Sequence, residues 1–228
     1  MSRLFNESQK REMAVRQKNI CHDCGDSLGE NYEAHHVKPY SDGGETSLDN
    51  GILACSSCHK VRHSAAWPML KQFRDLHTSD RFMWQIRGLF KVCGRVLNGE
   101  SVTSAEAVMA SGKSRFSVQA MMLVRALKGT STTIIMVPSR SIQSGYIEEI
   151  NLQDTGAVIE NRLPRGRRAQ SVPTADFIVV TYQEATKPAN VRFMVSMFEK
   201  WKRSGWKFGL VADEVHHSGT TKSWSAIG

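Results

Sequence analysis

Apolar residues in the C-terminal part of the chain form short, β-branched runs, and longer amphipathic stretches separate these runs. The expected strands cover residues 102–107, 132–137, 176–181 and 207–212. Between them, apolar residues recur at helical spacing over 114–127 and 190–201. Alternation of strands and helices predicts an α/β unit, a parallel sheet covered by helices.

The N-terminal hundred residues show a different pattern. Residues 1–20 are polar with scattered apolar points, which predicts a lead-in helix with a solvated charged face. From residue 66 onward the spacing becomes helical, and Pro68 fits a first helical turn. A second helix is expected over 82–96, where apolar and aromatic residues form a stripe typical of a buried core.

Composition narrows the class of protein. At 228 residues with 40% hydrophobic content, the chain has room for one small and one medium globular domain. The first twenty residues are too polar for a signal peptide, and no apolar run reaches membrane-spanning length. We therefore expect no membrane partner.

The charge is unevenly distributed. The formal net charge is +8; residues 1–65 carry 8 basic and 9 acidic side chains, whereas residues 66–228 carry 22 and 13. A basic chain favours a polyanionic partner, and the electrostatic grip on it should come mainly from the C-terminal part.

Four of the five cysteines form two Cys-x-x-Cys pairs, Cys21 with Cys24 and Cys55 with Cys58. Two such pairs present four thiolates in the tetrahedral arrangement that a structural zinc ion prefers. We read Cys93 as a buried free thiol, and this use of cysteine indicates a reducing compartment, the cytoplasm.

Four histidines lie between the cysteine pairs and just after the second pair. His35 and His36 are neighbours on an expected strand, so their side chains diverge, which suits one metal ligand and one free base. His59 and His63 are four apart on an expected helix and share a face, which suits gripping one ion. Between them lie a Gly-Gly turn and Asn50.

His-His-x-x-Pro, Gly-Gly, Asn and His-x-x-x-His, in this order, resemble the ββα-metal site of the HNH endonucleases, in the version stapled by two Cys-x-x-Cys knuckles. The resemblance implies that His35 and His59 bind a divalent metal, Mg²⁺ or another, with His63 as a third ligand. It implies that His36 deprotonates the attacking water and that Asn50 holds the loop that orients His36. The alternative is a zinc-stapled module that binds nucleic acid without cleaving it.

A second motif opens the α/β part. Ala107 to Ser114 approximates the phosphate-binding loop G-x-x-x-x-G-K-[ST], with alanine in place of the first glycine. A strand, a small-residue turn and a helix N-terminus aim backbone N–H groups at an anion. The nucleotide-binding residues would be Ala110, Ser111, Gly112, Lys113 and Ser114, with Lys113 on the terminal phosphates and Ser114 on magnesium.

The last expected strand runs into Asp213-Glu214-Val215-His216. Two acids at the carboxyl end of a parallel strand can divide the labour, Asp213 towards magnesium and Glu214 towards water. This motif resembles the DEAD/DEAH-box of superfamily 2 helicases, and the order of the remaining motifs fits that family too.

The same resemblance assigns further residues. Ile135 to Gln143, with Arg140, resembles motif Ia, and the stretch around Thr181 resembles the strand-end motif that touches nucleic acid. Gln85 stands where these proteins often keep an adenine-reading glutamine. The basic loop with Arg162, Arg165, Arg167 and Arg168 contacts the phosphate backbone or is a solvated loop tip; the sequence leaves both open.

Superfamily 2 motors have a second RecA-like lobe that supplies an arginine finger, and the sequence up to Gly228 contains no such lobe. We expect the chain to be a fragment, or else a partner or further subunit to supply the other half. An arginine finger is worth about 10³–10⁵ in rate, so we expect slow ATP turnover without it.

The sequence as a whole predicts three segments: an α+β, zinc-stapled HNH module at 1–65, a helical connector at 66–100, and an incomplete RecA-like P-loop lobe at 101–228. The expected function is metal-dependent cleavage of DNA, double-stranded by preference, coupled to an ATP-dependent helicase or translocase with ATP and Mg²⁺ as its cofactors. The alternative is a superfamily 2 ATPase whose zinc module binds DNA without cutting it. Such pairings are typical of restriction-like, phage or mobile-element enzymes.

Overall fold

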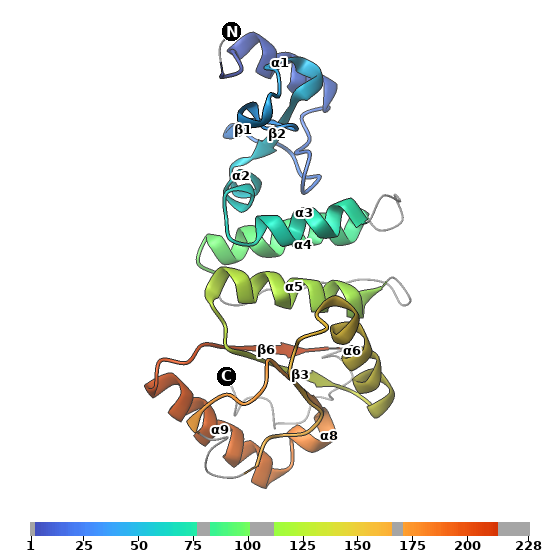
Figure 1. Cartoon of the computed structure of the whole chain (residues 1–228), viewed down its shortest axis with the longest axis vertical. Coiled ribbons are helices and arrows are strands. Elements are labelled where there is room, and N and C mark those ends of the chain that lie inside the picture. The colour runs from blue at the N-terminus through green and yellow to red at the C-terminus, as the bar shows by residue number, and fades with distance from the viewer. Residues whose placement is uncertain (1–2, 77–82, 101–111, 166–170, 214–228) are drawn as a thin grey trace. The chain divides into compact units, whose positions relative to one another are not determined.

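The computed structural model describes residues 3–76, 83–100, 112–165 and 171–213. The chain divides into two compact units, Met1–Glu106 and Ala107–Gly228 (Figure 1). Each unit has its own core and its own candidate chemistry. None of the described helices is both long and apolar enough to cross a bilayer.

The first unit is built on a ββα arrangement. Helix α1 (Glu7–Arg16) leads into the antiparallel pair β1 (Tyr32–His36) and β2 (Gly51–Cys55), and α2 (Ser56–Arg62) follows directly. The short 3₁₀ turns η1 (Tyr40–Asp42) and η2 (Leu48–Asn50) lie in the β1–β2 connection. Helices α3 (Trp67–Leu76) and α4 (Met83–Leu97) complete the unit and confirm the helical pattern read from residue 66 onward.

The first unit has a core of fully buried apolar side chains. Leu53 of β2, Val61 of α2, Leu70 of α3 and Leu89 of α4 are all 0% exposed. These four side chains come one from each element, so the helices that follow the ββα arrangement share its core rather than forming a separate layer.

The second unit is an α/β sandwich around a parallel sheet in the order β4-β5-β3-β6. Its strands are β3 (Thr132–Val137), β4 (Ile159–Glu160), β5 (Phe177–Thr181) and β6 (Phe208–Ala212). Figure 1 shows α5 (Lys113–Lys128) and α6 (Arg140–Gln153) on one face, and α8 (Tyr182–Ala185) and α9 (Pro188–Arg203) on the other.

Side-chain alternation along β3 explains this layering. Ile134 and Met136 pack with the α9 residues Met194 and Trp201, whereas Ile135 and Val137 join a second cluster with α5 and α6. Because successive residues of a strand point to opposite faces, an all-apolar strand needs cover on both sides. The prediction of a parallel sheet covered by helices is confirmed.

Three described elements, α6, β4 and α8, were not predicted. The expected strand at 102–107 lies outside the described residues. Helix α6 was not predicted, although Ile142, Tyr146 and Ile150 recur every four residues along it. The two-residue strand β4 and the single-turn helix α8 are too short to leave a periodic signal.

Candidate functional site

The four cysteines of the two pairs converge in the first unit. Their sulfur atoms all lie within 4.8 Å of one another, with Cys24 Sγ 3.9 Å from Cys55 Sγ. Hydrogen bonds from Cys24, Cys55 and Cys58 lower the pKa of the Cys21 thiol, whereas hydrogen bonds within the same cluster raise the pKa of Cys24 and of Cys58. Sulfur ligands on one tetrahedral zinc ion are about 3.8 Å apart, so these residues fit a structural zinc.

Three histidines gather on one side of the ββα arrangement. His35, near the end of β1, has its ring centroid 5.9 Å from His59 and 5.6 Å from His63. His59 Nε2 and His63 Nε2 are 3.2 Å apart. Two nitrogens on one tetrahedral zinc-sized ion stand about 3.3 Å apart, so the α2 pair is spaced as ligands are.

The three histidines are gathered more loosely than the thiols. Within the described ranges, the four cysteines are the only group of three or more His, Cys, Asp or Glu residues whose ligand atoms all lie within 4.8 Å. Bringing His35 onto an ion held by His59 and His63 therefore requires a small inward movement of its ring.

His35 is nevertheless prepared to be a ligand. Its Nδ1 lies 2.9 Å from the His36 carbonyl oxygen, which can only accept, so Nδ1 carries the proton and Nε2 keeps a lone pair. Burial lowers the pKa of His35 and of His59, which favours the neutral form that binds metals.

His36 points to the other side of β1, as expected for neighbours on a strand. Its ring packs against Phe5, with centroids 4.5 Å apart, and its Nε2 lies 3.1 Å from Thr46 Oγ1. Tyr40 borders the ring at 6.0 Å. Burial lowers the pKa of His36, which keeps the imidazole neutral and able to accept a proton.

Asn50 staples the connection between the two strands. Its Nδ2 donates to the carbonyls of Lys38 (3.0 Å) and Glu45 (2.8 Å), and its Oδ1 accepts from the Lys38 N–H (2.8 Å). Gly44 is required there, because a Cβ would collide with the Lys38 carbonyl oxygen and lie 2.8 Å from Asn50 Nδ2. The side chain thus closes the loop that follows His36.

In the second unit, several predicted residues collect at the carboxyl edge of the sheet. Because β3, β5 and β6 are parallel, Arg140 after β3, Thr181 at the end of β5 and Asp213 after β6 share that edge. The Asp213 N–H donates to the Met136 carbonyl, and Tyr182 Oη donates to the Asp213 carbonyl. Two bonds fix the backbone of Asp213.

The phosphate-loop residues are only partly described. Gly112 has a left-handed backbone (φ +83°) and caps α5, and Lys113 and Ser114 open that helix. Glycine adopts this conformation at no steric cost, which suits a turn that presents N–H groups to an anion. Ala110, Ser111, Glu214 and Arg167 lie outside the described residues.

Two other predicted residues have evident structural surroundings. Gln85 is 0% exposed in α4, within the first unit, so an adenine-reading role stays a prediction. Thr181 is 9% exposed, and its hydroxyl caps α8 by accepting from the Glu184 N–H at 3.3 Å.

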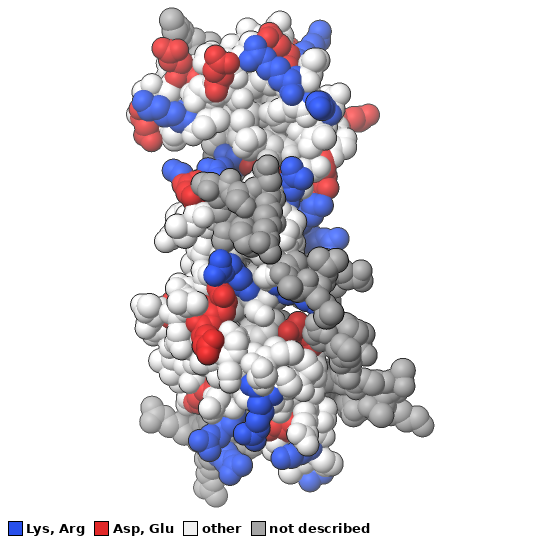
Figure 2. Space-filling model, turned by 90° about the vertical axis from the view of Figure 1, so that its right-hand side faces the viewer, with Lys and Arg blue, Asp and Glu red and all other residues white. Residues whose placement is uncertain are grey.

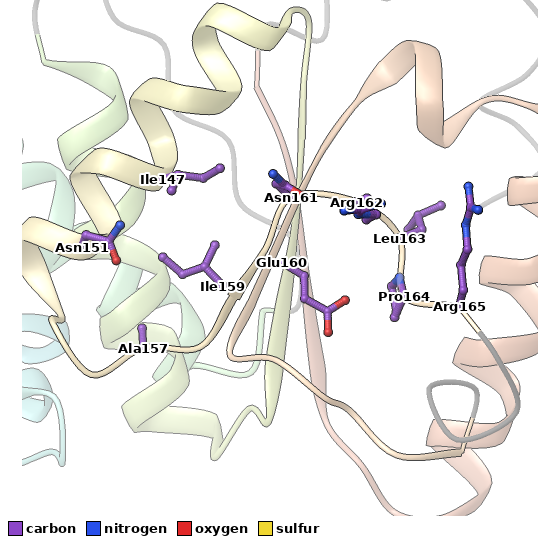
Figure 3. Close-up of a pocket in the computed structure, with 10 residues that line it drawn as sticks. All are labelled: Ile147, Asn151, Ala157, Ile159, Glu160, Asn161, Arg162, Leu163, Pro164 and Arg165. Carbon is purple, nitrogen blue, oxygen red and sulfur yellow. The ribbon is translucent and has the colours of Figure 1, made fainter.

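The basic loop borders a cavity of about 700 Å³ beside β4 (Figure 3). Arg162 and Arg165 follow the strand, and Ile147 and Asn151 reach the cavity from α6. The sequence identified the arginines but missed the α6 wall, because that helix was not predicted. On the face in Figure 2, basic and acidic side chains are interspersed over both units.

The ββα arrangement with its cysteine cluster and the parallel α/β sheet fit a nuclease module joined to a helicase/ATPase-type domain. The model of the HNH endonuclease family matches residues 21–65, and the model of the family described as type III restriction enzyme, res subunit, matches residues 81–228. The second match covers more than half of the sequence, and the chain belongs to this family. Neither the curated proteins nor the solved structures gave a match.

Proposed function

We propose that the first unit is a metal-dependent DNA endonuclease and that the second is an ATP-dependent helicase or translocase lobe. The observation that carries the first half is the division of labour across β1. The rings of His35, His59 and His63 gather on one side, and His36 stands on the other side against Phe5.

His36 takes a proton from water, the water oxygen bonds to phosphorus, and the ester P–O bond on the opposite side breaks. Asn50 holds the loop that follows His36, and the leaving oxygen takes a proton from solvent. A divalent ion held by His35, His59 and His63 would stabilise negative charge on the phosphate. Zinc in the cysteine cluster would be structural.

A plasmid nicking assay with Mg²⁺, Mn²⁺ or Ni²⁺ tests the nuclease. We expect His36→Ala to lower the nicking rate by about 10²–10⁴, the usual contribution of a general base. His22→Ala is the matched control, because it removes an exposed imidazole from the same module and leaves the gathered histidines intact. Nicking that survives His36→Ala removes the assignment of the base; a wild-type chain that nicks with none of these metals favours a DNA-binding zinc module.

In the second unit, the residues from Ala110 to Ser114 would bind the nucleotide, and an adenine-reading role for Gln85, which lies in the first unit, stays a separate prediction. Ser114 and Asp213 would hold magnesium, and Glu214 would orient the water. Arg140, Thr181, Arg165 and Arg167 would contact DNA. The fixed backbone of Asp213 and the capping turn at Gly112 support this arrangement. The four reduced thiols fit action in the cytoplasm.

Lys113→Ala tests the nucleotide site. We expect it to abolish binding of a fluorescent ATP analogue while plasmid nicking stays at the wild-type rate, because the two sites lie in different units. Lys128→Ala, at the far end of the same helix, is the control and should bind the analogue normally. Loss of nicking together with binding would mean that the two activities depend on each other.

A further inference from the structure

The ring of His36 is held by side chains from outside its own strand. Thr46 Oγ1 lies 3.1 Å from its Nε2, and Phe5 packs on its face at 4.5 Å. Thr46 lies in the loop that Asn50 closes, and Phe5 immediately precedes α1 with only 6% of its surface exposed. The first of these contacts can select a tautomer, and the second can fix the ring plane.

The hydroxyl of Thr46 suits the chemistry required of His36. If Nδ1 is to receive a proton from water, Nε2 must already carry one, and that N–H needs an acceptor. Thr46 Oγ1 is an acceptor at hydrogen-bond distance. It serves the neutral ring and the protonated ring equally, so the contact persists through proton transfer.

Helix α1 in turn holds Thr46. Gln9 Nε2 donates to the Thr46 carbonyl at 3.2 Å, and Gln9 Oε1 accepts from the Asn6 N–H at 2.9 Å. The Gln9 N–H donates to Asn6 Oδ1, which completes a capping box. The capped first turn of α1 therefore contacts the loop beside His36 through Gln9.

Strand β2, which pairs with the strand of His36, also lies close to α1. Gly51 is the register partner of His36 on β2. A Cβ at Gly51 would collide with the Met13 sulfur and lie 2.9 Å from the Phe5 ring. Helix α1 thus packs against the strand pair at the level of His36, at a position that only glycine allows.

We propose that Thr46 is a positioning residue for His36 and that α1, through Phe5 and Gln9, is part of the nuclease site. The inference rests on the proposed nuclease function. It extends the site beyond the HNH match, which begins at residue 21. A ring tipped away from the attacking water loses rate while substrate binding is unaffected.

The test uses the full zinc-loaded chain and compares Thr46→Val, Thr46→Ser and the control Thr130→Val. We expect Thr46→Val to lower kcat for nicking about tenfold with KM unchanged, which is the scale of one well-placed hydrogen bond. Thr46→Ser should stay within about twofold of wild type. Zinc content and circular dichroism identify any variant that fails to fold.

A second readout does not depend on cleavage. Nitrogen-15 NMR of the histidine rings should show His36 with its proton on Nε2 in the wild type and in Thr46→Ser, and a mixture of tautomers in Thr46→Val. An unchanged tautomer together with an unchanged kcat overturns the role of Thr46. If the wild type does not nick at all, the proposed function fails, and the NMR result alone then decides whether Thr46 orients the ring.

A separate pair of variants tests the role of α1. Gln9→Leu should lower kcat in the same direction as Thr46→Val, because it releases the Thr46 carbonyl. Lys10→Gln, the neighbouring change, leaves Thr46 untouched and should nick at the wild-type rate. Equal rates for Gln9→Leu and Lys10→Gln would exclude α1 from the site.

Discussion

Asp23 and Arg62 form a buried ion pair in the first unit. Arg62 Nε and Nη2 donate to the two Asp23 oxygens at 2.7 and 2.6 Å, and the side chains are only 3% and 1% exposed for Arg62 and Asp23. Asp23 sits inside the first cysteine pair and Arg62 ends α2, so the pair ties the metal cluster to the helix that carries His59. The Trp67 ring covers the guanidinium at 4.8 Å.

Removing one partner of this pair should be costly. Arg62→Met leaves the Asp23 carboxylate buried without its counterion, and we expect a loss of about 3–5 kcal/mol in the free energy of unfolding. Urea unfolding of the zinc-loaded chain measures it. The double variant Asp23→Leu with Arg62→Met removes both charges and should be more stable than Arg62→Met alone; equal stabilities would show that the lost charge pairing is not the cause.

Asp176 connects secondary-structure elements. It stands just before β5 and bonds to Arg125 of α5 and to Val158, the residue before β4. Burial raises its pKa, but bonds from the Val158 N–H and Arg125 outweigh burial and hold the pKa of Asp176 below its usual value. Oδ2 accepts from Val158 at 2.9 Å, and Oδ1 accepts from Arg125.

Asp176→Asn should lower the free energy of unfolding by about 1 kcal/mol at pH 7. A depressed folded pKa stabilises the fold above the pKa of the unfolded state, near 3.9, and that contribution disappears as the pH falls through the lower folded value. The difference in Tm between wild type and variant should therefore be constant from pH 7 to pH 5 and shrink below pH 4. A difference that grows on acidification would contradict this assignment.

The local pattern of apolar and polar residues predicted some helices and strands well and missed others. The strand at 132–137 was predicted with its observed bounds, because six β-branched or apolar residues in a row are visible in the sequence, and all six are buried in the structure. Helix α6 was missed because its apolar residues are diluted by polar ones and by Gly145. The candidate histidine and cysteine ligands were identified from their spacing in the sequence, because each pair lies within a few residues along the chain. The contact of Thr46 with His36 was not predicted, because the two residues are ten apart in the sequence across an irregular loop and Thr46 is also held by Gln9 of α1.

At the scale of the whole molecule, the two units rest on different sources of stability. The second unit contains two large apolar clusters, one on each face of its sheet. The first unit has a buried apolar core too, and its β1–β2 region carries in addition a cluster of four thiols. Binding free energy of a structural zinc becomes folding free energy in such a region.

Removal of zinc by a chelator should therefore destabilise the first unit and leave the second unit folded. Treatment with a strong zinc chelator should remove amide hydrogen-exchange protection from β1 and β2 and leave β3 and β5 protected. Zinc added back should restore the lost protection, which controls for irreversible damage. Uniform loss of protection across both sheets would show that the units fold as one.

Helix α2 carries Cys58 in its first turn and His59 immediately after it, with His63 at its end. A seven-residue helix has no room to let one end move while the other stays fixed. We therefore expect binding of a cation by the imidazoles to depend on prior binding of zinc by the cysteines. In the proposed nuclease, zinc depletion should then abolish nicking however much of the second divalent metal is supplied.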